Sequence, residues 1–265
     1  MKKIHSIVLV TLSWLLLSGT AAHASSNGTA HARYPIKDST LTDNDLYYTS
    51  ELESSNCREK PIKRNNVASA KRYVTAILDC LNRSWGAHFE DRGLPFEKAR
   101  VAFITKPRRY CGNSWGDAAA MYCDKENRFT VLLNKTALDD PFDLFLFDTT
   151  AHEYGHHIQN LMEITSAYEE HAFKNKSELY EQSRRHELQA ECLAGVFIGS
   201  VWDSLSRNTG DWKEMLALDR QSGDEGSKIR SHGKGRNIAA WLDRGFKAVS
   251  PEACNTWAAS SAKVA

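Results

Sequence analysis

A strict helical repeat near the middle of the chain constrains the fold more than any other feature. Apolar residues recur at alternating steps of three and four positions over residues 144–161, as in a helix that buries one face. The repeat consists of Leu144, Phe147, Ala151, Tyr154, Ile158 and Leu161. Asp139, Asp140 and Pro141 precede it and are typical of a helix start. We therefore expect a central helix that packs other elements around its apolar stripe.

A His-Glu-x-x-His pattern, His152-Glu153-x-x-His156, lies beside that stripe. Residues four positions apart share one helix face, so both imidazoles can bind one zinc ion at roughly 2.0–2.1 Å. Glu153 projects beside the pair and can hold a metal-bound water without binding the metal itself. A pair of solvent-facing histidines is the alternative, but the neighbouring apolar stripe favours a Zn²⁺ site with His152 and His156 as ligands.

A catalytic zinc needs a third protein ligand. A metzincin would carry a glycine and a histidine where this chain has Gln159 and Met162, which excludes that class. The helix expected at 177–205 offers an E-x-x-x-E pair, in which one carboxylate can bind zinc while the other orients a ligand imidazole. By analogy with Glu-zincins, Glu187 is the ligand and Glu191 its partner. The alternative is a solvated helix face, where like charges cost about 0.2–0.5 kcal/mol.

The N-terminus, residues 1–24, has the composition of a secretory signal peptide. Two lysines are followed by a short apolar core at 7–17 and a small-x-small cleavage site at 22–24. The apolar core is too short and too interrupted to favour a membrane anchor. We expect an exported protein, periplasmic or extracellular, that begins near Ser25 and keeps no stable membrane anchor.

Six cysteines follow the signal peptide. An even count in an exported protein suggests disulfides, and no C-x-x-C pair suggests a structural zinc site. The connectivity stays open; pairing by proximity in the sequence gives Cys57–Cys80, Cys111–Cys123 and Cys192–Cys254. Free buried thiols are the alternative, because Cys192 lies on an apolar helix face.

The rest of the chain predicts a single α+β domain, mainly helical with a small sheet, over residues 57–257. Residues 25–56 are polar and lack periodicity, so we interpret them as a flexible leader or short propeptide, and 258–265 as a flexible tail. Small residues at Ala190, Ala194, Gly195 and Gly199 would let their helix approach a neighbour closely. The expected elements are helices near 66–85, 139–161, 177–205, 212–218 and 235–249, and strands near 101–105 and 129–133.

The charge of the chain indicates its class of partner. Loss of Lys2 and Lys3 with the signal leaves 34 − 2 = 32 basic residues against 33 acidic ones. A chain so close to neutral gives no sign of binding nucleic acid or an anionic membrane. We expect a peptide or protein substrate and no nucleic-acid partner.

Five motifs occur in a fixed order along the chain, at residues 152–159, 187–195, 231–233, 241–246 and 250–254. With Cys111-Gly112 and Tyr122-Cys123 upstream, they resemble the bacterial putative neutral zinc metallopeptidase family over roughly residues 57–257. The resemblance implies a zincin-like domain that uses Zn²⁺ to hydrolyse peptide bonds. The family has Asp where this chain has Glu191, and a Gln and an Arg where it has Asn237 and Ile238.

The expected mechanism gives each polar residue a role. Glu153 is the general base, which takes a proton from water and delivers it to the leaving amine. His232, in a loop beside Gly233, is expected to stabilise the oxyanion, with an ordinary loop histidine as the alternative. His157 and His186 are expected to be structural or solvent-facing. The strand at 129–133 is either the one that a peptide substrate pairs with or an internal strand.

Two other functions fit the same residues. One is a non-proteolytic zinc-binding or regulatory domain, although a purely structural site would not need Glu153. The other is a zinc hydrolase that acts on cell-wall peptides. The two hydrolases would differ in pocket shape and cleavage products, which residue spacing does not specify.

Overall fold

The structure is a computed structural model that describes residues 32–139 and 143–265. The signal peptide predicted at residues 1–24 lies outside these ranges. Within them, no helix is long and apolar enough to cross a membrane. The architecture is mainly helical α+β with a small three-stranded sheet, as predicted.

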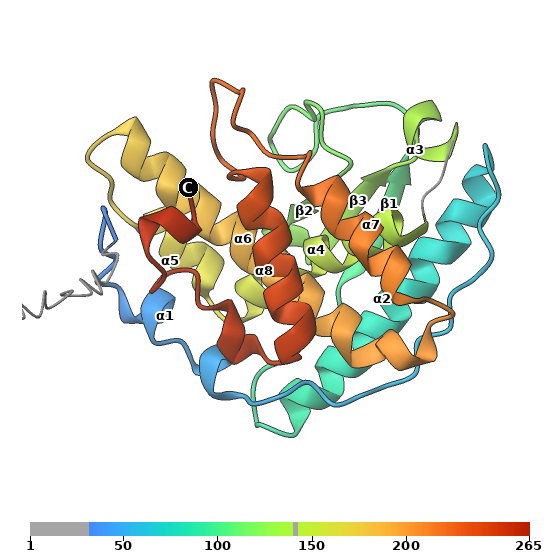
Figure 1. The fold of residues 1–265 in the computed structure, drawn as a ribbon, viewed down its shortest axis with the longest axis horizontal. Coiled ribbons are helices and arrows are strands. Elements are labelled where there is room, and N and C mark those ends of the chain that lie inside the picture. The colour runs from blue at the N-terminus through green and yellow to red at the C-terminus, as the bar shows by residue number, and fades with distance from the viewer. Residues whose placement is uncertain (1–31, 140–142) are drawn as a thin grey trace, which may run out of the picture.

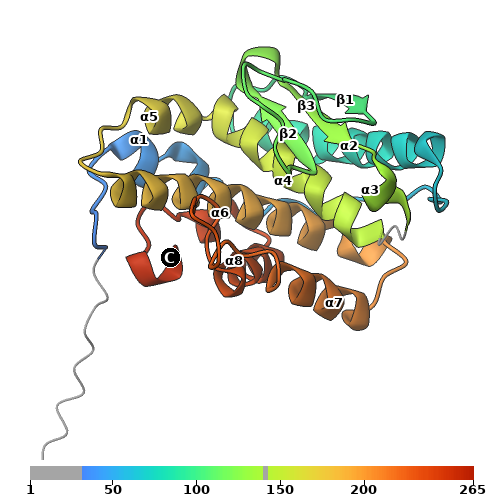
Figure 2. The ribbon, with the colours of Figure 1, turned by 90° about the horizontal axis from the view of Figure 1, so that it is seen from above.

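Helix α4 (Asp143–Leu161) lies at the centre of the fold (Figure 1). Figure 2 shows it between two layers, with the sheet and α2 (Val67–Glu90) on one side and α6 (Lys176–Val201) on the other. The predicted stripe is confirmed over five of its six positions, because Leu144, Phe147, Ala151, Tyr154 and Ile158 are all at most 1% exposed, whereas Leu161 at the end of the helix is only partly buried.

The other helices follow the predicted pattern with small shifts. The side chain of Asn66 caps α2 by accepting a hydrogen bond from Ser69 N. The predicted start of α4 is wrong at Asp139, which ends a separate short helix, while Asp140 and Pro141 lie outside the described residues. The remaining helices are α1 (Ser39–Thr42), α3 (Lys135–Asp139), α5 (Ile164–Glu170), α7 (Thr209–Asp219) and α8 (Gly235–Ala248).

The sheet contains β1 (Arg100–Ile104), β2 (Ala120–Cys123) and β3 (Arg128–Leu132) in the order β1-β3-β2. Strand β1 pairs with β3 in parallel, and β2 pairs with β3 in antiparallel. Strand β2 was not predicted from the sequence. Strands β1 and β2 pair with the two edges of β3, so the strand predicted at 129–133 is internal. The outer edge of β2 is the edge on the side opposite β3.

The three disulfides have the predicted pairing, and the described residues contain no free cysteine. Cys57–Cys80 joins the N-terminal segment to α2, and Cys111–Cys123 joins a loop to the end of β2. Cys192–Cys254 joins α6 to the short 3-10 helix at Pro251–Cys254. The predicted close approach of α6 to a neighbour is also present, because a Cβ on Gly195 would overlap the carbonyl oxygen of Leu242 on α8.

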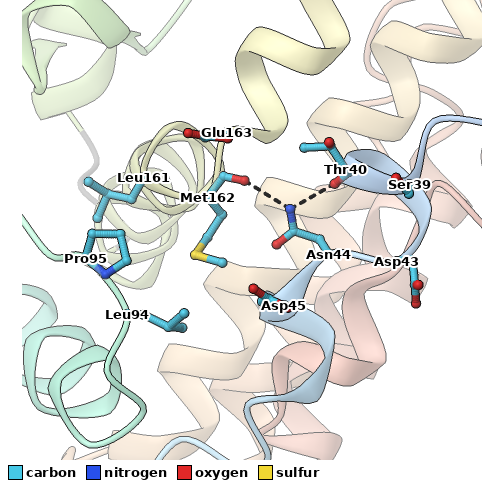
Figure 3. A pocket seen from close by; sticks show the side chains of 10 residues that line it. All are labelled: Ser39, Thr40, Asp43, Asn44, Asp45, Leu94, Pro95, Leu161, Met162 and Glu163. Atoms are coloured by element: carbon cyan, nitrogen blue, oxygen red, sulfur yellow. Dashed lines mark hydrogen bonds between the residues drawn. The ribbon is translucent and has the colours of Figure 1, made fainter.

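The predicted flexible leader is wrong for residues 38–56. Leu41, Leu46 and Leu52 are at most 2% exposed. Asn44 Nδ2 donates hydrogen bonds to Met162 O beyond the end of α4 (3.0 Å) and to Thr40 O (2.8 Å), as Figure 3 shows. These apolar residues are too far apart to form a local repeat, but they all pack on the common core.

The predicted flexible tail at 258–265 is also wrong. Val264 is fully buried. Asn237 Nδ2 donates to Ala265 O (2.6 Å), and Trp241 Nε1 donates to Lys263 O (2.8 Å). Both donors lie on α8, so the tail is fixed to that helix.

Candidate metal centre

Close packing of α4 on α6 brings the predicted site together. A Cβ on Gly155 would lie only 2.5 Å from the carbonyl oxygen of Ala190. The missing side chain therefore lets the two backbones approach at this point. Because Ala190 lies between Glu187 and Glu191 in the chain, both carboxylates are presented to the histidine face of α4.

His152, His156 and Glu187 converge on one point. Glu187 Oε2 lies 3.4 Å from His152 Nε2 and 3.3 Å from His156 Nε2. One donor atom from each residue lies within 4.8 Å of the others, which is close enough for all three to hold one ion. Two imidazole nitrogens and one carboxylate oxygen form a donor set found in catalytic zinc sites. The three residues therefore fit the zinc ion that the sequence predicts.

The charges of these groups support the same fit. Burial alone lowers the pKa of His152, but hydrogen bonds with Glu187 and Glu191 and their charges raise it well above its ordinary value. Burial raises the pKa of Glu187, but the charge of His156 and hydrogen bonds with both histidines bring it well below. The centre thus favours an ionised carboxylate together with positive charge, which either protons or a metal ion can supply.

Each histidine is oriented through its second nitrogen. His152 Nδ1 donates to Glu191 Oε2 (2.7 Å), and His156 Nδ1 donates to Gln159 Oε1 (2.8 Å). Because Nδ1 carries the proton in both rings, Nε2 is left to bind a metal. Glu191 therefore lies where predicted despite its extra methylene. Gln159 was missed as a positioning residue, although its place three residues after His156 puts both on one helix face.

Two cavities, of ≈ 230 Å³ and ≈ 500 Å³, adjoin this centre. His152, Glu153, Glu187 and His232 line both of them. Glu153 is 7% exposed, and its Oε2 has no hydrogen-bond partner among the described residues. Burial raises the pKa of Glu153, against the opposing charges of the two histidines. Its carboxylate is therefore suited to accept and hold a proton.

His232 reaches the centre from the loop before α8. Its Nε2 lies 3.7 Å from Glu187 Oε2, and its side chain is 61% exposed. Asp224 Oδ2 accepts hydrogen bonds from the backbone N–H groups of His232 (2.9 Å) and Gly233 (3.0 Å), which fixes the loop. His232 is thus the predicted site residue with the greatest access to solvent.

The other two histidines near the centre are buried. His157 Nδ1 lies 2.9 Å from the hydroxyl of Tyr122, and its Nε2 lies 2.7 Å from Glu97 O. His186 stacks on His156 with ring centroids 4.9 Å apart, and burial lowers its pKa to about 3. Both are therefore structural, which is one of the two alternatives expected for them; neither faces solvent.

Comparison with known proteins agrees with this geometry. The family described as Putative neutral zinc metallopeptidase matches residues 34–257. The chain belongs to this family. The match also covers most of the segment expected to be a leader, which the structure packs on the core.

Two relatives share this similarity. The uncharacterized protein YpfJ of Escherichia coli (strain K12) is 28% identical over 214 residues, which is 74% of each chain. The uncharacterized protein Rv2575 of Mycobacterium tuberculosis (strain ATCC 25618 / H37Rv) is 27% identical over 130 residues, 42% of this chain and 43% of that one. No solved structure matches the chain.

Proposed function

We propose that this protein is an exported zinc metallopeptidase that hydrolyses peptide bonds with Glu153 as the general base. The observation that carries the proposal is the convergence of His152 Nε2, His156 Nε2 and Glu187 Oε2 beside a buried Glu153. Membership of the family supports the class of zinc peptidases in general. A purely structural zinc site would have no use for Glu153 in that position.

Each residue of the centre would have its own role in the reaction. Zinc held by His152, His156 and Glu187 would lower the pKa of a water toward about 7 and polarise the scissile carbonyl. Glu153 accepts the proton of the attacking water and passes it to the leaving amine. Its Oε2, which is buried and has no hydrogen-bond partner within the described part of the chain, is the atom that would carry this proton.

The peptide substrate would bind along the outer edge of β2. An edge strand offers unpaired backbone groups to which an extended peptide can add. Ala120, at the start of β2, lines both cavities, and Met121 and Tyr122 line the larger one, so β2 runs past both. A peptide on this edge would pass Glu153. This arrangement replaces the strand at 129–133 as the proposed substrate strand.

His232 would donate a hydrogen bond to the developing oxyanion. Its position at the rim of both cavities, 3.7 Å from Glu187 Oε2, supports this role. Its exposure leaves room for substrate to approach.

Export rests on the predicted signal peptide and on the three disulfides. Disulfides persist in oxidising compartments such as the periplasm or the extracellular medium. All six cysteines of the chain are paired in this way.

The test is cleavage of a mixed quenched-fluorescence peptide library by zinc-loaded protein from Ser25 onward. Wild type is compared with Glu153→Gln and with a matched control, Glu90→Gln, on the exposed end of α2. Zinc content is equalised in all three samples. We expect wild type and the control to cleave at similar rates. The cleavage rate of Glu153→Gln should be at least about 100-fold lower than that of wild type. Equal cleavage by Glu153→Gln, or none by zinc-loaded wild type, would overturn the proposal.

A further inference from the structure

A second group of acidic side chains lies next to the metal centre, and the proposed reaction does not use it. Asp148 on α4, Glu191 on α6 and Asp219 at the end of α7 bring carboxylate oxygens within 4.8 Å of one another. Their residues are 6%, 6% and 5% exposed. Three helices from distant parts of the sequence therefore place three buried carboxylates at one point.

One oxygen of each carboxylate lacks a hydrogen-bond partner among the described residues. Asp148 Oδ1, Glu191 Oε1 and Asp219 Oδ2 are buried, and no described residue hydrogen-bonds to them. All three residues line the cavity of ≈ 230 Å³. Burying charged oxygens without hydrogen bonds or a counter-charge is strongly unfavourable. The cluster therefore needs positive charge from a proton or a bound cation.

The surrounding basic groups form no ion pair with Asp148 or Asp219 in the part of the chain that the structure describes. His152 hydrogen-bonds Glu191 through the other carboxylate oxygen, Oε2, and is committed to the first centre. The guanidinium of Arg220 donates from Nη1 to Leu216 O on its own helix (3.2 Å). Among the ion pairs of the described residues, none involves Asp148 or Asp219.

We propose that Asp148, Glu191 and Asp219 bind a calcium ion beside the zinc centre. The donors are all carboxylate oxygens, which suit a hard cation rather than zinc or copper. Calcium binds oxygens at 2.3–2.6 Å, so its ligands can lie up to about 5 Å apart, whereas magnesium demands a tighter octahedron. The adjoining cavity gives space for the waters that complete calcium coordination.

Calcium bound here would link three helices and the zinc centre. It would hold α7 against α4 and α6 through one carboxylate from each helix. It would also fix Glu191, whose other oxygen accepts the hydrogen bond of His152 Nδ1. The zinc ligand and the second cation would therefore share one positioning residue.

The experiment measures ⁴⁵Ca²⁺ binding by equilibrium dialysis up to 5 mM, on protein stripped of metal and reloaded with one equivalent of zinc. Wild type is compared with Asp219→Asn and with Glu214→Gln, an exposed site on the same helix with the same charge change. We expect one calcium per chain for wild type and Glu214→Gln, and at least 30-fold weaker binding for Asp219→Asn. Failure of wild type to bind calcium, equal binding by Asp219→Asn, or stronger binding of Mg²⁺ would overturn the proposal.

Thermal unfolding of the same proteins gives a second readout that does not depend on catalysis. Calcium should raise the Tm of wild type, because a ligand that binds only the folded state stabilises it. Without calcium, Asp219→Asn should have a higher Tm than wild type, because the substitution removes a buried charge. With calcium, wild type should have the higher Tm, because only wild type binds the ion tightly. If Asp219→Asn is more stable under both conditions, the cluster is neutralised by protons and the calcium site is refuted. Because neither readout uses peptide cleavage, failure here is separate from failure of the peptidase proposal.

Discussion

Gly155 on α4 lies so close to Ala190 on α6 that a Cβ would sit 2.5 Å from the Ala190 carbonyl oxygen. This contact sets the distance between the histidine helix and the glutamate helix. The two nearest atoms of that contact are backbone atoms, so it cannot be relieved by a side-chain rotation.

Gly155→Ala should therefore push the two helices apart. Overpacking of this kind costs roughly 1–3 kcal/mol of stability, and we expect zinc affinity to fall at least tenfold as Glu187 withdraws from the histidines. Gly226→Ala is the matched control, because a Cβ there meets nothing within 4 Å. Competition with a chelator gives the zinc affinity. A Gly155→Ala protein that binds zinc like wild type would contradict this role for the contact.

The two glutamates of α6 should respond differently to substitution. Glu187→Ala should lose zinc, because it removes a proposed ligand. Glu191→Ala should retain part of the zinc and lose activity, since residues that orient a ligand imidazole typically contribute 10–100-fold. Zinc content by mass spectrometry and cleavage rate are measured together. Equal zinc occupancy in wild type and Glu187→Ala would refute the ligand assignment.

Gln159 should also matter to zinc affinity. Its Oε1 accepts the hydrogen bond of His156 Nδ1, while its Nε2 donates to His186 O (2.7 Å). Gln159→Met keeps a similar volume and removes these hydrogen bonds, so we expect about tenfold weaker zinc binding. Asn160→Met is not a suitable control, because the side chain of Asn160 donates a hydrogen bond to the hydroxyl of Tyr122. Glu163→Gln is a suitable control, because Glu163 is exposed and lies just beyond the end of α4. Unchanged affinity in Gln159→Met would contradict the positioning role.

His88 on α2 should make stability depend on pH. Burial, and next the charge of Arg92, lowers its pKa from 6.5 to about 4. The unfolded chain therefore binds the proton more tightly, and stability falls as pH decreases from about 6.5 toward 4. The loss between pH 7.5 and 5 should be on the order of 1–2 kcal/mol. His88→Phe should remove this part of the slope in urea unfolding; an identical slope would contradict the assignment.

Local patterns in the sequence predicted the centre of the fold well. The stripe of α4, the histidine pair and the glutamate pair all depend on helical periodicity, which is visible within a few turns. The disulfides followed pairing by proximity along the chain. The α6–α8 contact followed from small residues such as Gly195.

Features that depend on distant contacts were not predictable in this way. Strand β2 has only four residues and no clear alternation, and pairing with β3 defines it. The segment expected to be a leader is held by contacts such as Leu52 N to Val249 O (2.7 Å), almost the length of the domain away in sequence. The buried cluster of Asp148, Glu191 and Asp219 likewise appears only when three helices meet.

We expect His152, His156 and Glu187 to hold one zinc ion together. Anomalous diffraction at the zinc absorption edge, from crystals of the zinc-loaded protein, tests this expectation. We predict one strong peak within about 2.0–2.2 Å of both Nε2 atoms and a Glu187 oxygen. A zinc peak elsewhere, or no peak between these three side chains when they are ordered, would contradict the assignment of the three ligands.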